Sequence, residues 1–355
     1  MDQFVGTMPV AEKQRFDLAR LESYLRAHVA GYSGALEVEQ FKGGQSNPTY
    51  RLSAGGKSYV MRAKPGPAAK LLPSAHAVER EFRVISALSK ADIPVPKTYA
   101  LCEDEGVIGR AFYIMDCVDG RVLWDQSLPG MSKAERGAIY DEMNRVIAAL
   151  HQVDYAAIGL ADYGKPGNYF ARQIGRWSKQ YQASATESIE AMDNLIAWLP
   201  NNIPPGDETT VVHGDYRLDN LVFHPTEPRV LAILDWELST LGHPLADISY
   251  HCMSWRIPPG QSRGISGLDL AALGIPTEEE YVAAYCRRTG RGRIDNWDFY
   301  LAYNMFRLAA ILQGIVKRAA DGTAASAHAL AAGERTRPMA ELAWSYAQKI
   351  IAAGE

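Results

Sequence analysis

Three oxygen-bearing side chains lie at spacings that suit chemistry on a phosphate group. Residues 213–220 read H-G-D-Y-R-L-D-N, in which Asp215 precedes Asn220 by five positions. Asp235 follows Asn220 by 15 positions and comes directly after an apolar run, in I-L-D-W-E. Carboxylate and amide oxygens are the hard ligands that Mg²⁺ prefers, and a carboxylate beside an alcohol can accept its proton. These residue types could therefore supply the charge neutralisation and alignment on which phosphoryl transfer depends.

The spacing is also that of the catalytic loop of protein kinases, H-R-D-L-x-x-x-N, whose Asp is the base and whose Asn binds Mg²⁺. We therefore expect Asp215 to be the catalytic base and Asn220 to bind the metal. Asp235 stands where the metal-binding Asp of the D-F-G motif would be, with Trp and Glu as the next two residues. Arg217 lies two residues after the base, and we expect it to steady the transferred phosphate by a charged hydrogen bond.

Other polar residues near this loop are expected to support it. His213 is interpreted as a packed, hydrogen-bonded histidine, and Asp219 as solvent-facing or structural. Asp247 occurs in G-H-P-L-A-D-I-S-Y at the start of a predicted helix, where its apolar neighbours turn it inward. A buried carboxylate needs partners, so we expect it to accept backbone N–H groups of residues 213–215. A simple helix cap is the alternative.

A positive charge for the nucleotide phosphates is expected at Arg62, on the strand Y-V-M-R. It stands where protein kinases carry the Lys of V-A-I-K, so the charge is kept while the geometry changes. Glu81, in R-E-F-R on the following helix, is the predicted ion-pair partner; Glu79 is the nearer rival, and a solvated helix face is the alternative. Upstream, a Gly-Gly turn occupies the place of a phosphate-covering loop, with Ser46 and Asn47 as hydrogen-bond donors to phosphate oxygens.

The run F-Y-I-M-D-C-V, residues 112–118, fits a strand that leads to an adenine-binding hinge. Backbone groups near Asp116, Cys117 and Val118 would then contact the base. A plain buried strand would have the same pattern, so both interpretations stay open.

The elements that must position these residues divide the chain into a strand-rich and a helix-rich part. Runs of alternating apolar residues that are bounded by Gly and Pro predict antiparallel strands near 35–41, 49–53, 58–62, 98–102 and 111–118, with one inserted helix capped by Ser74. Helical periodicity then predicts helices at 132–151, 169–183, 188–199, 244–253, 278–288, 297–317 and 325–352, around a β-like stretch at 210–236. We therefore expect an α+β protein, with an N-lobe at 1–117 that includes a helical N-terminal extension, and a C-lobe at 118–355.

Composition excludes several other classes. The 355 residues include 37 Lys and Arg against 41 Asp and Glu, a net charge of −4, without the basic excess of a nucleic-acid-binding protein. No membrane span and no signal-peptide core are expected. The four cysteines form no C-x-x-C pair, so we expect free buried thiols and a cytoplasmic location.

Together these motifs resemble the aminoglycoside phosphotransferase and choline-kinase-like superfamily of small-molecule kinases. The resemblance rests on H-G-D-Y-R-L-D-N, I-L-D-W-E, G-H-P-L-A-D-I-S-Y, R-E-F-R and Y-I-M-D-C-V-D-G, and it extends from about Leu36 to the C-terminus. It implies a bilobal protein-kinase-like fold, ATP or GTP as co-substrate, and a hydroxyl acceptor. The branch that it resembles most is associated with acyl-CoA dehydrogenases, which implies a hydroxylated acyl chain or its CoA thioester as the acceptor.

Three other functions stay open at this stage. The fold could serve as a catalytically weak nucleotide-binding module, or the enzyme could be a kinase of aminoglycosides or amino alcohols. A metal-dependent hydrolase could use His213, Asp215, Asp235 and His243. The acceptor pocket is expected after Gly242, with 257–268 as a candidate lid. The arginines Arg256 and Arg263 there could attract an anion or simply face solvent, and a monomer or a homodimer is expected.

Overall fold

The structure is a computed structural model that describes residues 6–42, 47–66, 77–260, 264–321 and 326–354. Its chain contacts divide it into two compact units. Unit 1 comprises residues 1–124, 155–161 and 218–239, and unit 2 comprises 125–154, 162–217 and 240–355. The predicted boundary after residue 117 falls seven residues before the first segment of unit 1 ends, and residues 218–239 pack with unit 1 although they come late in the chain.

Unit 1 contains a six-stranded antiparallel sheet in the order β1-β2-β3-β4-β6-β5. The five predicted strands are β2 (Glu37–Phe41), β3 (Thr49–Ala54), β4 (Lys57–Ala63), β5 (Thr98–Cys102) and β6 (Phe112–Asp116). The short β1 (Thr7–Met8) joins them from the N-terminal extension, which also contains the helix α1 (Leu18–His28). Both glycines of the β3–β4 turn, Gly55 and Gly56, have positive φ, the conformation that a tight two-residue hairpin requires.

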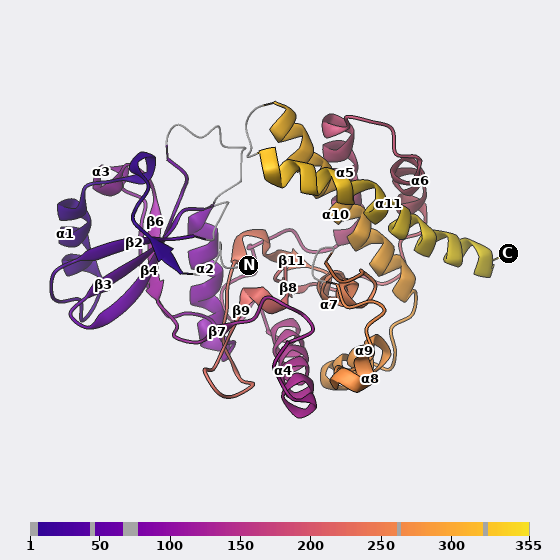
Figure 1. The fold of residues 1–355 in the computed structure, drawn as a ribbon, viewed down its shortest axis with the longest axis horizontal. Helices are drawn as coiled ribbons and strands as arrows, with labels where there is room; N and C mark the ends of the chain where they lie inside the picture. The colour runs from indigo at the N-terminus through magenta and orange to yellow at the C-terminus, as the bar shows by residue number, and fades with distance from the viewer. Residues whose placement is uncertain (1–5, 43–46, 67–76, 261–263, 322–325, 355) are drawn as a thin grey trace. The chain divides into compact units, whose positions relative to one another are not determined.

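Alternation along the strands gives the sheet two different faces. One face carries Tyr50, Leu52, Met61 and Phe112, which pack with the buried leucines of α1 in one apolar cluster. The intervening residues, among them Arg62, therefore project from the opposite face. The helix α2 (Val78–Leu88) lies at that side, and Figure 1 shows α1 and α2 on opposite sides of the strands.

A second, three-stranded sheet in unit 1 has the order β10-β9-β7. Its strands are β7 (Arg121–Val122), β9 (Leu221–Phe223) and β10 (Val230–Ile233). The hairpin β9–β10 brings two distant positions together, because the N–H of Leu234 donates to the carbonyl of Asn220 at 2.8 Å. Gly120 enters this sheet beside Phe223, where a Cβ would lie 2.3 Å from the Phe223 carbonyl oxygen. Only glycine fits at this close approach.

Unit 2 is mainly helical, as predicted. Its longer helices are α4 (Lys133–His151), α5 (Tyr169–Ser184), α6 (Glu190–Trp198), α7 (Pro244–Cys252), α9 (Glu278–Thr289), α10 (Trp297–Ala320) and α11 (Ser326–Gly354). Ser132 and Glu135 form a capping box that starts α4. The β-like stretch contributes β8 (Thr210–Val212), which pairs with β11 (Thr240–Gly242). Figure 1 shows α10 and α11 packed together beside α5 and α6.

Shorter helical turns complete both units. They are α3 (Glu105–Ile108), between two of the predicted strands, α8 (Leu270–Leu273), and 3₁₀ turns at Glu12–Gln14, Ser89–Ala91, Leu199–Asn201, Leu218–Asn220, Trp236–Leu238 and Met253–Trp255. By length and composition α10 could cross a membrane, but 78% of its apolar window is buried inside the structure. A buried core helix of a soluble protein meets the same criterion.

Candidate active site

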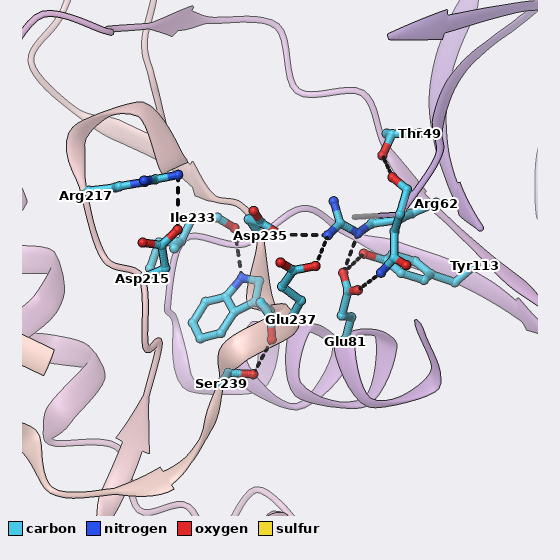
Figure 2. A network of polar contacts seen from close by, with 12 residues as sticks. Thr49, Arg62, Glu81, Tyr113, Asp215, Arg217, Ile233, Asp235, Glu237 and Ser239 are labelled. Carbon is cyan, nitrogen blue, oxygen red and sulfur yellow. Dashed lines mark hydrogen bonds and ion pairs between the residues drawn. The ribbon is translucent and has the colours of Figure 1, made fainter. Parts of the chain in front are cut away.

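The guanidinium of Arg62 on β4 lies among three carboxylates of unit 1 (Figure 2). Its Nε is 2.7 Å from Oε2 of Glu81, and its Nη2 is 2.7 Å from Oδ1 of Asp235. Glu237 is more distant, with its Oε2 at 3.4 Å from Nη2. Burial disfavours the Arg62 charge, but the carboxylates of Glu81 and Asp235 outweigh this and raise the Arg62 pKa. The planar guanidinium thus joins the helix α2 to the segment after β10.

The predicted choice of Glu81 over Glu79 agrees with the observed ion pairs. Glu81 is 1% exposed and receives further hydrogen bonds from Asn47 Nδ2 at 2.8 Å and from the Tyr113 hydroxyl at 3.1 Å. Burial raises the Glu81 pKa, and the Arg62 charge opposes this rise. Glu79, two residues earlier on α2, instead pairs with Lys64 at 2.9 Å. A helix places residues two apart on different faces, which separates the two glutamates.

The predicted phosphate-contacting residues have different outcomes. Ser46 lies outside the described residues. Asn47 is fully buried, and its amide donates to Glu81 as above. A contact of either residue with a phosphate stays a prediction.

A cavity of about 310 Å³ lies within unit 1 beside the Arg62 cluster. Its walls come from both sheets and from α2. Apolar lining residues include Val60, Ile85, Pro96, Met115, Val122, Val222 and Ile233. Polar lining residues include Thr49, Arg62, Asp116, Asp219, Asn220 and Asp235. An apolar cavity with a few convergent polar groups is the usual form of a small-molecule site.

The predicted hinge lines this cavity, since Asp116, Cys117 and Val118 all belong to its wall. The Asp116 N–H donates to the Lys97 carbonyl at 2.8 Å, and its carboxylate accepts from the Tyr99 hydroxyl at 2.5 Å. Both groups are thus engaged in holding the strand. The backbone after Asp116 is the part of the hinge that can contact a planar base.

The two predicted metal ligands, Asn220 and Asp235, flank the two ends of the β9–β10 hairpin, next to the Leu234–Asn220 backbone hydrogen bond, and both line the cavity. Asp235 has a left-handed backbone, with φ of 63°, which is uncommon for a residue with a side chain and typical of functional sites. No cluster of three or more His, Cys, Asp or Glu side chains suited to a metal occurs among the described residues. One carboxylate and one amide oxygen fit Mg²⁺ all the same, because Mg²⁺ usually takes few protein ligands and completes its shell with phosphates and water.

Residues 213–217 of the predicted catalytic loop lie in unit 2, where the backbone of His213 and Gly214 contacts a buried carboxylate. Asp247 on α7 accepts the N–H of His213 at 2.7 Å and the N–H of Gly214 at 2.8 Å, as the sequence predicted. His151 contacts the same carboxylate at 3.2 Å. Burial alone would raise the Asp247 pKa, but the His151 hydrogen bond and the other contacts lower it. Gly214 has φ of 82°, so the loop needs glycine at this position.

The Asp215 side chain is 14% exposed and has a donor at each oxygen. Arg217 Nη2 lies 3.2 Å from Oδ2, as Figure 2 also shows. The hydroxyl of Tyr250 donates to Oδ1 at 2.7 Å. The predicted base is thus oriented from both sides, and Arg217 contacts the base itself.

Sequence reasoning missed three residues of this neighbourhood. Tyr250 ends the G-H-P-L-A-D-I-S-Y run and His151 ends the helix predicted at 132–151, yet no role was predicted for either. Arg307 lies on α10, is 6% exposed, and donates to the Gly214 carbonyl at 2.7 Å. A single arginine in the long apolar run of α10 was the available signal, because a buried charge requires a partner. Of the two loop arginines, Arg256 pairs with Glu278, and Arg263 lies outside the described residues.

Comparison with known proteins agrees with this geometry. The model of the phosphotransferase enzyme family matches residues 37–303. Acyl-CoA dehydrogenase family member 10 of Mus musculus is 49% identical over 347 residues, which cover 97% of this chain and 32% of that protein. A crystal structure described as a putative aminoglycoside phosphotransferase from Ralstonia eutropha is 67% identical, with a TM-score of 0.88 over 94% of this chain and 99% of that one.

A more distant neighbour shows the fold alone. A mutant of aminoglycoside phosphotransferase APH(4)-Ia, in a complex with ADP and hygromycin B, is 16% identical, with a TM-score of 0.58 over 90% of this chain and 97% of that one. The chain spans only about a third to under a half of the curated acyl-CoA dehydrogenase family members 10 and 11 that it matches.

Proposed function

Because the chain belongs to the phosphotransferase enzyme family, we propose that it transfers the γ-phosphate of ATP or GTP to the hydroxyl group of a hydroxyacyl-CoA or a hydroxy acid. One observation carries the nucleotide part of this proposal. Arg62, ion-paired to a buried glutamate, lines a 310 Å³ cavity together with an amide and a carboxylate suited to a metal. This is the pairing of charge and cavity that a nucleoside triphosphate requires.

The nucleotide would lie with its base against the apolar wall that Val60, Met115 and Val222 form. The hinge backbone after Asp116, at Cys117 and Val118, would accept hydrogen bonds from the base and donate hydrogen bonds to it. Arg62, which Glu81 holds in place at 2.7 Å, would contact the phosphates. Because Arg62 also contacts Asp235, a bound triphosphate would share the guanidinium with that carboxylate.

Asn220 and Asp235, which both line the cavity, would hold Mg²⁺ through side-chain oxygens. When bound, the ion would neutralise charge on the phosphate oxygens. The protein would contribute two oxygen ligands whose positions the β9–β10 hairpin determines, since the Leu234 N–H to Asn220 carbonyl bond ties its ends together.

Asp215 would accept the proton of the acceptor hydroxyl. Asp247 holds the loop that carries it through two backbone hydrogen bonds. Arg217, which contacts Asp215 at 3.2 Å and whose side chain is 31% exposed, would steady the transferred phosphate by a charged hydrogen bond. Holding the reacting groups close together and correctly oriented can lower the activation free energy by several kcal/mol, as the effective molarities of intramolecular reactions indicate.

The acceptor class rests on two features. The curated relatives are named acyl-CoA dehydrogenase family members, although the chain spans only part of their length. In addition, the partly exposed Arg217 places a positive charge beside the Asp215 carboxylate of the proposed base. A positively charged surrounding favours an anionic acceptor, such as a carboxylate or a CoA ester, over a polycation.

An aminoglycoside or amino-alcohol acceptor is the second candidate. It is favoured by the crystal structure at 67% identity, which is described as a putative aminoglycoside phosphotransferase. The two candidates predict opposite charge preferences, so one acceptor panel distinguishes them.

The test is an ATP-consumption assay with Mg²⁺ over hydroxyacyl-CoAs, free hydroxy acids, aminoglycosides and amino alcohols. We expect hydroxyacyl compounds to stimulate turnover and Asp215→Asn to abolish the stimulation while AMP-PNP still binds. Stimulation by the amines alone would establish the second candidate. If no acceptor raises turnover above that of the variant, the chain is a nucleotide-binding module and the enzyme proposal fails.

A further inference from the structure

Arg307 is a buried cation of unit 2, only 6% exposed. Burial disfavours its charge, but the neighbouring tyrosines and Asp215 outweigh this and raise the Arg307 pKa. Its Nη2 donates to the Gly214 carbonyl at 2.7 Å. Its guanidinium carbon lies 5.1 Å from the ring centre of Tyr250 and 5.7 Å from that of Trp177. Burying a charge is costly. The hydrogen bond and the aromatic contacts of Arg307 therefore indicate a role beyond packing.

The contacts of Arg307 complete the restraint of one peptide unit. Asp247 holds the N–H groups of His213 and Gly214 from one side. Arg307 holds the Gly214 carbonyl, which belongs to the peptide that leads into Asp215. Gly214 itself has the left-handed φ of 82°. The backbone orientation before Asp215 therefore depends on two charged side chains, one on α7 and one on α10.

Tyr250 extends this restraint from the backbone to the carboxylate. Its hydroxyl donates to Asp215 Oδ1 at 2.7 Å, while its ring lies under the Arg307 guanidinium. Burial and the negative charge of Asp215 raise the Tyr250 pKa, so the hydroxyl remains a donor at neutral pH. Because Oδ1 accepts the Tyr250 hydrogen bond, Oδ2 is the oxygen that faces Arg217, whose Nη2 lies 3.2 Å away.

We propose that Arg307 and Tyr250 are positioning residues that orient Asp215, Arg307 through the Gly214 carbonyl and Tyr250 through the carboxylate. This inference rests on the proposed function of Asp215 as the base. Arg307 also lies beyond residues 37–303, which the family model matches. Misplacement of a reacting group by about 1 Å can cost on the order of 100-fold in rate, which sets the size of the expected effect.

The test compares Tyr250→Phe and Arg307→Lys in the full chain with Tyr281→Phe as the matched control. Tyr281 is 2% exposed, and its hydroxyl has no hydrogen-bond partner among the described residues. We expect Tyr250→Phe to lower kcat by roughly 10- to 100-fold, with the KM for ATP and the affinity for AMP-PNP within about twofold of the parent. Arg307→Lys keeps the charge but lacks the planar guanidinium, so we again expect a lower kcat with an unchanged KM for ATP. Tyr281→Phe should change neither constant.

A second readout does not need an acceptor. In protein labelled with ¹³C at the aspartate carboxyl carbon, the Asp215 signal is identified by its loss in Asp215→Asn. Tyr250→Phe should move this signal, and Tyr281→Phe should not. An unmoved signal, or equal rate losses in Tyr250→Phe and Tyr281→Phe, would overturn the positioning role. If the signal moves but no acceptor of the panel supports turnover in the parent protein, the proposed kinase function fails and the contact stands.

Discussion

Replacement of Arg62 by Met tests the charge cluster of unit 1 most directly. Methionine keeps much of the length of the side chain and removes the guanidinium that contacts Glu81 and Asp235 at 2.7 Å each. Arg62→Lys is the companion change, because a single ammonium cannot reproduce a planar fork that contacts both carboxylates at once. We expect both variants to bind AMP-PNP more weakly, and the Met variant also to lose stability.

The size of that loss follows from the burial of the partners. Removing one member of a buried ion pair costs about 3–5 kcal/mol, mostly from the charge left behind. Glu81 is 1% exposed but keeps the hydrogen bonds from Asn47 and Tyr113. We therefore expect about 3 kcal/mol, the lower end of that range. The Asp235 and Glu237 side chains are 32% and 24% exposed, so solvent screening makes their contribution to the loss of stability small.

Urea denaturation of the parent, Arg62→Met, Glu81→Gln and the double variant forms a thermodynamic cycle. The neutral amide removes the unpaired charge, so the double variant should recover about 2 kcal/mol of the loss. Arg62 is the main influence that lowers the Glu81 pKa, so its removal raises that pKa further above the ordinary value of 4.5. A carboxyl whose pKa is raised in the folded state makes the protein less stable as the pH rises through that pKa. Relative to the parent, Arg62→Met should therefore be more stable at pH 5 than at pH 8. Additive losses, or a cost below about 1 kcal/mol, would refute the ion-pair reasoning.

Three further changes probe the metal ligands and the loop. Asp235→Asn should remove the gain in AMP-PNP affinity that Mg²⁺ provides over EDTA in calorimetry; an unchanged metal dependence would exclude Asp235 as a ligand. Asp247→Ala leaves two buried N–H groups without an acceptor, so urea denaturation should show a loss of about 3–5 kcal/mol, and a loss below about 1 kcal/mol would contradict this account. Gly214→Ala places a Cβ at φ of 82°, which should cost at least about 1 kcal/mol and lower kcat. Gly290→Ala, at φ of 70° on a helix end, should cost stability without lowering kcat, and equal kcat losses in both would contradict the role of the loop.

Local patterns predicted most of the secondary structure. Helix α4 was expected at 132–151 and occupies Lys133–His151, because Ser132 and Glu135 form a capping box next to a regular apolar period. The five predicted strands of the N-terminal sheet are present. The short strand β1 and the helix α3 were missed, since two to four residues are too few to show a period.

Long-range partners could not be predicted with the same certainty. The position of β6 between β4 and β5, the packing of residues 218–239 with the N-terminal unit, and the contact of Arg307 with Gly214 all join residues far apart in the chain. No spacing in the sequence indicates such a contact, because it depends on how complete elements pack.

By itself, the sequence determined which chemical groups are available and their local spacing. The five-residue offset of Asp215 and Asn220, and an aspartate directly after an apolar strand, follow from adjacent residues alone. The tertiary structure decided which of these groups meet. It pairs Glu81 rather than Glu79 with Arg62, closes the β9–β10 hairpin beside Asp235, and places Tyr250 on the Asp215 carboxylate. The physical reason is that side-chain direction is set by helix and strand geometry, whereas contact depends on packing between elements.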